Sequence, residues 1–244
     1  MIATTPIEAA QVHRMKRMLV KTAATLGRED ARYLVNAYYD VQRHRESAEA
    51  QFLRADSSQP HQLIAWLAEQ DRVVEKQIKR ALDEWTDALP AARWAKSIIG
   101  VGPVIAAGLA AHVDISKCGT VSQIWRFAGY DPTQRWTCGM KCPWNQQLKH
   151  VCGLAGESFV KTSGHEDGFY GRFYLARKRV EHGRLPPAQV HVRAMRWAVK
   201  LFLAHYYYVA WIAETGVEPP KPYAMEILGQ DGFIAPPNFD GGVR

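Results

Sequence analysis

The chain has 244 residues, of which 47% are hydrophobic and 23% are charged, so it is long enough to bury a sizeable core in one large domain or two small ones. Its formal net charge at pH 7 is +7 and its pI is about 9.3, which favours a polyanionic partner over an enzyme with an acidic substrate. No run of about 18 apolar residues and no signal-peptide pattern is present, so we expect a cytoplasmic protein that does not span a membrane.

Residues 1–90 carry helical patterns and no strand pattern. Leu34, Val41 and Ala48 recur at seven-residue spacing, and Arg45 interrupts the apolar stripe that they form. Two long amphipathic helices joined by a short turn predict an antiparallel helical hairpin, a coiled-coil-like arm. The arm is either part of the core or a dimerisation coil, and the second alternative agrees with the homo-oligomer that we expect. The expected helices cover residues 6–26, 28–55 and 61–88, with a turn at 56–60.

A short glycine-rich turn separates two apolar helical segments in the middle of the chain. Gly100 and Gly102 flank Val101, and Pro103 suits the first position of the next helix. The pattern predicts a helix, a tight hairpin and a second helix, whose N-terminus presents backbone N–H groups to an anion such as a nucleic-acid phosphate. It is typical of a helix-hairpin-helix that contacts the DNA backbone without reading sequence. The alternative is an ordinary corner between helices, in which glycine and proline only break the chain.

The regular structure expected in the rest of the chain is also helical, which makes the fold all-α. After the arm over residues 1–90 we expect a helix-hairpin-helix domain over 91–215 and a tail rich in proline and glycine over 216–244. The tail keeps several apolar residues, which favours its docking on the domain as an extended strap. The helices expected after the hairpin cover residues 121–127, 145–160, 169–182 and 188–215.

Positive charge gathers in the second half of the chain. Residues 121–210 hold 13 Lys and Arg but only five Asp and Glu. Arg193, Arg196 and Lys200 are spaced three and four apart, which places them on one helical face. Aromatic residues interleave with the basic ones, as in a groove that follows a phosphate backbone and stacks a base; a solvated charged face is the alternative. The candidate DNA-binding residues are Gly100, Val101, Gly102, Arg126, Lys141, Arg177, Arg179, Arg193, Arg196 and Lys200.

The four cysteines follow no export signal, so thiols or metal ligands are favoured over disulfides. No cofactor is expected, although a Cys₃His zinc site remains one alternative at a spacing that fits no standard zinc motif. Reduced thiols packed against Trp136 and Trp144 are the favoured alternative. A third is a nucleophilic Cys138 whose thiolate is favoured by Lys141 or Lys149. The weak zinc candidates are Cys138, Cys142, His150 and Cys152.

Four segments together resemble a known family. Residues 98–107 look like a Pro-Gly-Ile-Gly-Pro hairpin, 124–132 like a Leu-Ala-Gly-Leu-x-Pro turn, and 168–177 with 191–200 like closing Phe-Tyr and basic helices. In this order they resemble the C-terminal domain of the insertion-sequence transposases that join a DEDD (RuvC-like) nuclease domain to a serine recombinase-like domain, the RNA-bridged group. The two long helices before residue 92 resemble that family's coiled-coil insertion.

Two departures from the family limit what the resemblance implies. Residues 1–90 hold no strand with a first metal-binding aspartate, so no DEDD set can be assigned. Cys138, within Thr137-Cys138-Gly139, stands where the family has its catalytic serine. We therefore expect a transposase-related DNA-binding protein, without catalysis, from a phage or mobile element. The alternatives are a strand transferase or nuclease using Cys138, Ser158 or Ser163, an RNA-binding module, since the family is RNA-guided, and a protein-interaction module.

Overall fold

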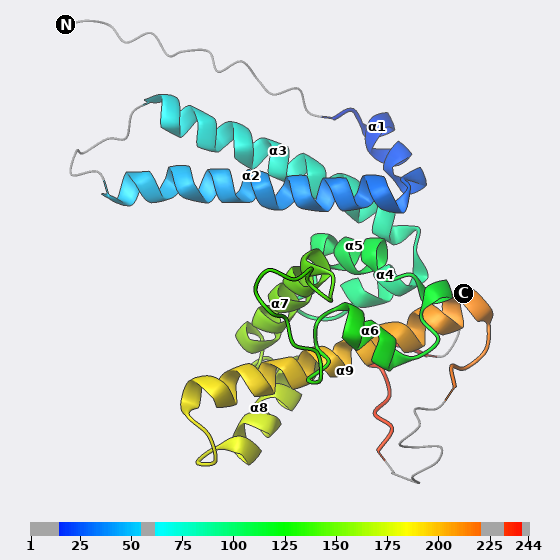
Figure 1. Cartoon of the computed structure of the whole chain (residues 1–244). Coiled ribbons are helices and arrows are strands. Elements are labelled where there is room, and N and C mark those ends of the chain that lie inside the picture. Colours follow the sequence, from blue (N-terminus) through cyan, green and yellow to red (C-terminus); the bar gives the residue numbers. More distant parts are fainter. Residues whose placement is uncertain (1–14, 55–61, 221–231, 241–244) are drawn as a thin grey trace, which may run out of the picture. The chain divides into compact units, whose positions relative to one another are not determined.

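The structure is a computed structural model that describes residues 15–54, 62–220 and 232–240, and all regular structure within these ranges is helical (Figure 1). The expected all-α fold is confirmed. None of the helices in the described ranges combines the length and apolar character that crossing a membrane requires. The chain forms two compact units, Met1–Trp85 and Thr86–Arg244. The first part of the helix expected over 6–26, the turn at 56–60 and the tail residues 221–231 and 241–244 lie outside the described residues.

The first unit is built on two long helices, α2 and α3, that lie side by side (Figure 1). Trp85 Nε1 donates a hydrogen bond to the Leu26 carbonyl at 3.0 Å, just before α2 begins. Further along α2, Tyr38 Oη donates to the Glu75 carboxylate of α3 at 3.1 Å. From the first contact to the second, the residue number rises on the α2 side and falls on α3, so the two helices run antiparallel. The elements of this unit are α1 (Arg17–Thr22), a 3₁₀ turn (Ala23–Thr25), α2 (Arg28–Arg54) and α3 (Gln62–Asp87).

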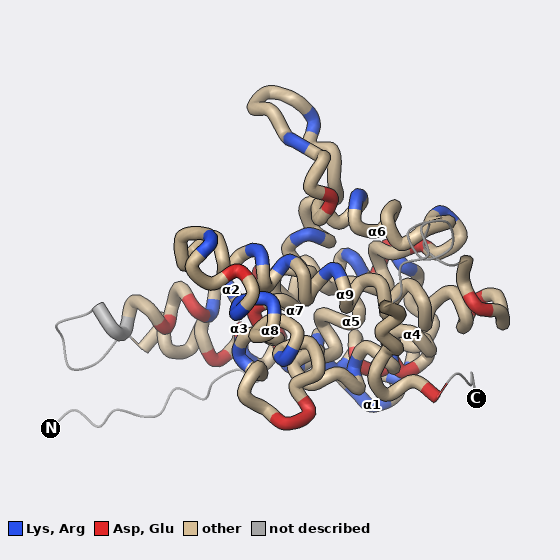
Figure 2. Tube along the Cα trace, turned by 90° about the horizontal axis from the view of Figure 1, so that it is seen from below, with Lys and Arg blue, Asp and Glu red and all other residues tan. Residues whose placement is uncertain are grey.

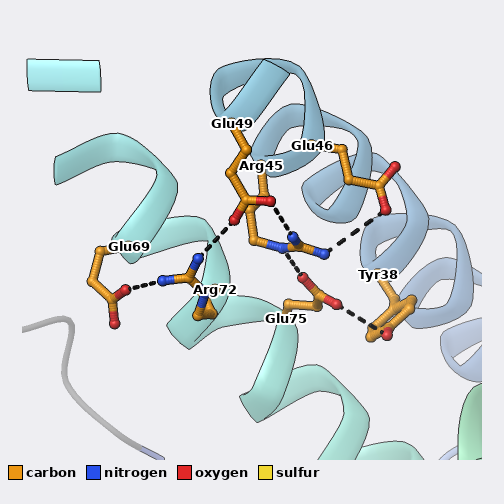
Figure 3. A network of polar contacts seen from close by, with 7 residues as sticks. All are labelled: Tyr38, Arg45, Glu46, Glu49, Glu69, Arg72 and Glu75. Carbon is orange, nitrogen blue, oxygen red and sulfur yellow. Dashed lines mark hydrogen bonds and ion pairs between the residues drawn. The ribbon is translucent and has the colours of Figure 1, made fainter. Parts of the chain in front are cut away.

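A polar network between α2 and α3 explains why Arg45 interrupts the apolar stripe (Figure 3). Its guanidinium donates to Glu75 at 2.7 Å and to Glu49 at 2.9 Å. The Arg45 and Glu75 side chains are only 16% and 15% exposed. Arg72 of α3 pairs with Glu49 of α2 at 2.7 Å, so two ion pairs of the network join the helices. Burial, together with the Glu75 carboxylate, raises the pKa of Tyr38 to about 12, so its hydroxyl remains a donor.

The second unit consists of shorter helices arranged around α9. Proline occupies the first turn of α4, α5 and α9, where its missing N–H costs no hydrogen bond. The Asn145 side chain caps α7 by accepting from Leu148 N at 2.9 Å, and Gly216 ends α9 at a φ of 73°. The helices are α4 (Pro90–Lys96), α5 (Pro103–His112), α6 (Val121–Phe127), α7 (Gln146–Lys161), α8 (Phe169–Glu181) and α9 (Pro187–Thr215), with a 3₁₀ turn at Ile115–Lys117.

An aromatic cluster joins α7, α8 and α9. α9 packs against α4, α6, α7 and α8, whereas α5 packs against α4 and α7. Phe159 lies 4.8 Å from Tyr170 and 5.2 Å from Phe202 between ring centroids, and all three side chains are at most 1% exposed. Such pairs stabilise beyond their area of burial. The cluster therefore fixes the helices that carry the basic residues.

His205 links this cluster to the tail. Its Nε2 lies 2.8 Å from the Ile234 carbonyl, which can only accept, so Nε2 carries the proton. Its Nδ1 then accepts from the Tyr170 hydroxyl at 2.8 Å. Burial lowers the pKa of His205 to about 4, so the ring is neutral at pH 7.

Residues 232–240 of the tail lie along the body as an extended strap. Trp94 Nε1 of α4 donates to the Pro237 carbonyl at 2.7 Å, and Asn238 Nδ2 donates to the Ser97 carbonyl at 3.0 Å. The docking expected from the apolar residues of the tail is observed for this part of it.

We predict that Glu75→Gln destabilises the first unit by roughly 1–3 kcal/mol, because Arg45 stays half-buried with a weakened partner. Glu69→Gln, which weakens only the more exposed pair with Arg72, should change stability by at most about 0.5 kcal/mol. Amide hydrogen exchange in α2 and α3 measures both effects. Equal protection loss in the two variants would contradict the role given to the Arg45–Glu75 pair.

We predict that the second unit loses stability as the pH falls from 6.5 to about 4, because the unfolded chain protonates His205 in this range and the folded chain does not. The loss from this group is roughly 3 kcal/mol, complete below the folded pKa and absent above pH 6.5. His205→Gln keeps one donor and one acceptor and should remove this component. Denaturant unfolding across the range measures it, with exposed His182→Gln as the matched control; parallel curves for wild type and His205→Gln would refute it.

Candidate nucleic-acid interface

A pocket of about 750 Å³ lies in the second unit, between the segment that joins α6 to α7 and the first half of α9. Asp131 is the only carboxylate among its lining residues. Four of the residues predicted to bind DNA line it together, although α8 and α9 contribute them separately. The cationic lining residues are Lys149 of α7, Arg177 of α8, and Arg193, Arg196 and Lys200 of α9.

Three of these cations lie over aromatic rings, and none of the three forms an ion pair with a carboxylate in the described ranges. Such contacts stabilise a positive charge and fix its position without neutralising it. The rings come from α6 and the segment that follows it, and the cations from α7 and α9. Trp125 also donates from Nε1 to the Lys200 carbonyl at 3.0 Å, which holds this ring against α9. The distances to the ring centroids are 3.9 Å for Lys149 Nζ over Trp144, 5.5 Å for Arg196 Cζ over Tyr130 and 4.0 Å for Lys200 Nζ over Trp125.

Charge repulsion persists in the pocket. Burial lowers the pKa of Lys149 and of Lys200, and the Arg196 charge lowers both further. Asp131 opposes this effect at Lys200, but its carboxylate is also engaged elsewhere. It accepts from the Thr133 backbone N–H and hydroxyl at 2.9 and 2.7 Å, which lowers the pKa of Asp131. An anion bound here would relieve the repulsion.

Glu181 compensates the other side of the pocket. Its side chain is 6% exposed, and it pairs with Arg177 on its own helix and with Arg193 of α9 at 3.6 Å. By contrast, no carboxylate in the described ranges forms an ion pair with Arg196 or Lys200. The uncompensated charge is therefore concentrated at the α7 side of the pocket.

The glycine turn between α4 and α5 packs against α7. Gly100 has a φ of +89°, and Gly102 precedes Pro103, the first residue of α5. Ser158 Oγ of α7 donates to the Gly100 carbonyl at 2.7 Å. A Cβ atom at Gly100 would lie 2.3 Å from that hydroxyl, so only glycine fits. Val101 is buried in the same turn.

The structure does not bring this turn to the pocket. Ser158 faces the turn, whereas Gly156 faces α9, where a Cβ atom would lie 2.9 Å from Val199 Cγ2. Two residues apart on a helix is a rotation of about 200°, so these are opposite faces of α7. None of Gly100, Val101 and Gly102 lines the pocket, and the face of α7 that meets the turn is opposite the face that meets α9. Arg126, Lys141 and Arg179 are exposed and do not line the pocket.

Lys149 is the cationic lining residue of the pocket that is missing from the candidate DNA-binding residues. It belongs to the basic run, but it lies on α7, 44 residues before Arg193. Nothing in the linear spacing relates it to the basic face of α9. A capped helix with a lysine in its first turn was the only local signal.

The predicted zinc ligands do not form a metal site. Across the described residues, no three His, Cys, Asp or Glu side chains are close enough to hold a metal ion. His150 is exposed and Cys152 is buried, because residues two positions apart on a helix point to nearly opposite sides. Burial raises the pKa of Cys152. Cys138 is exposed and Cys142 half-buried, and neither lines the pocket.

We predict that Arg196→Gln raises the pKa of both Lys149 and Lys200, because it removes a repelling charge from beside them. NMR titration of the lysine side-chain signals measures the two values. Arg179→Gln, an equal loss of charge at an exposed position of α8 outside the pocket, is the matched control and should change neither. Unchanged pKa values in Arg196→Gln would contradict the arrangement of charges described above.

No family model, no curated protein and no solved structure matches this chain. The likeness of residues 92–211 to a transposase domain thus stays a prediction that rests on its motifs. The pocket itself therefore supplies the basis for inferring what the chain binds.

Proposed function

We propose that this chain binds nucleic acid, DNA in the first place, through phosphates held at the cationic pocket and along α8 and α9. The observation that carries the proposal is the set of cations held over rings instead of carboxylates, since this leaves positive charge available to an anion. Figure 2 shows Lys and Arg gathered on α8, α9 and the segment that leads to α7. A polyanion that follows this surface neutralises several charges at once.

The basic face of α9 suits a phosphate chain. Arg193, Arg196 and Lys200 extend along about 10 Å of helix. Successive phosphates on one strand of a duplex advance by roughly 3.4 Å along its axis, so the face spans about three of them. Contacts of this kind position a nucleic acid without reading its sequence. We therefore expect binding with little sequence preference.

DNA takes precedence over other polyanions because of the transposase resemblance in residues 92–211. The glycine turn is not needed for this proposal, since none of its residues lines the pocket. RNA is the alternative partner and is an arm of the test. Catalysis at Cys138 is not proposed, because the thiol does not line the pocket.

We predict that Arg193, Arg196 and Lys200 changed together to Glu weaken duplex DNA binding at low salt by at least tenfold. The slope of log affinity against log salt concentration should fall by about 3 in magnitude, since about 0.9 is lost for each phosphate contact. Fluorescence anisotropy of a labelled duplex over a salt series measures both, with a single-stranded DNA and a structured RNA in parallel.

The matched control reverses three exposed charges on α3, at Lys76, Lys79 and Arg80. It makes the same change in net charge and should leave the slope unchanged. Wild-type affinity and slope in the α9 variant, with its helical circular dichroism intact, would reject the proposal. RNA bound more tightly than both DNA forms would replace DNA as the partner.

A further inference from the structure

The pocket is larger than a phosphate contact requires. Phosphates bind to the side of a helix or to a flat basic surface, and the exposed cations of α8 already provide one. A hollow of about 750 Å³ lies instead within the range of sites that enclose a small organic molecule, about 300–1,000 Å³. Something bulkier than a phosphate fits it.

The lining changes character along α9. Its first turns contribute Ala188, Gln189 and Val192, which are uncharged, beside Arg193, which is paired with Glu181, and the following turns contribute Arg196 and Lys200. The two groups are about 10 Å apart along the helix. A ligand with an anionic end and a flat, weakly polar end would match both.

The pocket also offers an aromatic ring and a hydrogen-bond acceptor. Trp197 of α9 lines the pocket and is half-buried. Gln134 lines it too, and within the described part of the chain its buried Oε1 accepts no hydrogen bond. A buried carbonyl oxygen without a donor is unfavourable, so a ligand N–H or O–H at this position would be stabilised. The exocyclic amino group of a base and a sugar hydroxyl are such donors.

The charged end is suited to a phosphate dianion. Lys149 and Lys200 are partly desolvated and repelled by Arg196, which lowers their pKa. A phosphate between them would relieve this repulsion. Glu181 pairs with the arginines nearer the other end, so the phosphate is drawn to the α7 side.

From these observations together we infer that the pocket holds one unpaired nucleotide of a bound strand, its phosphate at Lys149, Arg196 and Lys200 and its base at Val192 and Trp197, with the Gln134 carbonyl open to a ligand donor. The inference rests on the proposed function and specifies it: duplex binds along the surface, whereas a single strand or an overhang also fills the pocket. An unstacked base on an aromatic side chain is the usual basis of single-strand preference.

The test uses the full chain and isothermal titration calorimetry with three small probes: deoxyadenosine monophosphate, inorganic phosphate and deoxyadenosine. We expect the monophosphate to bind at least tenfold more tightly than either of its parts. A single-stranded oligonucleotide should displace it more effectively than a blunt duplex, because the duplex shares Arg196 and Lys200 with it but leaves the uncharged end empty.

Val192→Trp fills the uncharged end without changing any charge. Val192 is 46% exposed, so the larger side chain requires no repacking of the core. We expect at least tenfold weaker binding of the monophosphate and of the single strand, with an unchanged salt slope for the duplex. Val180→Trp, on α8 outside the pocket and 55% exposed, is the matched control and should behave as wild type.

The outcomes separate this inference from the proposed function. Monophosphate that binds no better than phosphate, with duplex binding intact, overturns the nucleotide site and leaves the proposed function standing. Monophosphate that no strand displaces overturns the assignment to a nucleic-acid strand, since the site then takes free nucleotides. Absence of binding by every probe and by duplex rejects both.

Discussion

The contact of cations with aromatic rings is the constraint on which the binding surface depends. Like charges within one pocket repel, and carboxylates are the usual remedy. Here Lys200 lies 4.0 Å above the Trp125 ring, and the same indole donates to the Lys200 carbonyl. The Trp125 ring thereby fixes both the Lys200 side chain and the position of α6 against α9. The charge is held in place and remains available to an anion.

In the arm formed by α2 and α3, carboxylates neutralise the partly buried positive charges instead. Arg45 is paired with Glu75 and Glu49, and Arg72 with Glu49, so charge is consumed in joining two helices. Residues 1–85 contain 13 of the 31 Lys and Arg and 12 of the 24 Asp and Glu, and almost all of the net charge of +7 therefore belongs to residues 86–244. The composition of the whole chain understates how basic the second unit is.

Local sequence signals are sufficient to predict the helices and the shared face of the basic residues on α9. Pro103 and Gly216 mark helix ends through their own backbone preferences, which need no tertiary contact. The spacing of Arg193, Arg196 and Lys200 fixes their common face because it depends only on helical geometry. The apolar stripe of the arm was also visible, but the partner that makes Arg45 acceptable within it lies 30 residues away, on another helix.

What the sequence could not supply is the rotation of α7 about its axis. Because of that rotation, Gly156 faces α9 and Ser158 faces the glycine turn. The turn and α9 therefore contact opposite faces of α7. It also brings Lys149 into the pocket, because residues 149 and 156 are seven apart and share a face. A turn and a basic helix, each with the local pattern of a phosphate contact, therefore need not act on the same phosphate chain. Gly156 permits the close approach of α7 to α9, and without that approach the lysine and the arginines would not line one pocket.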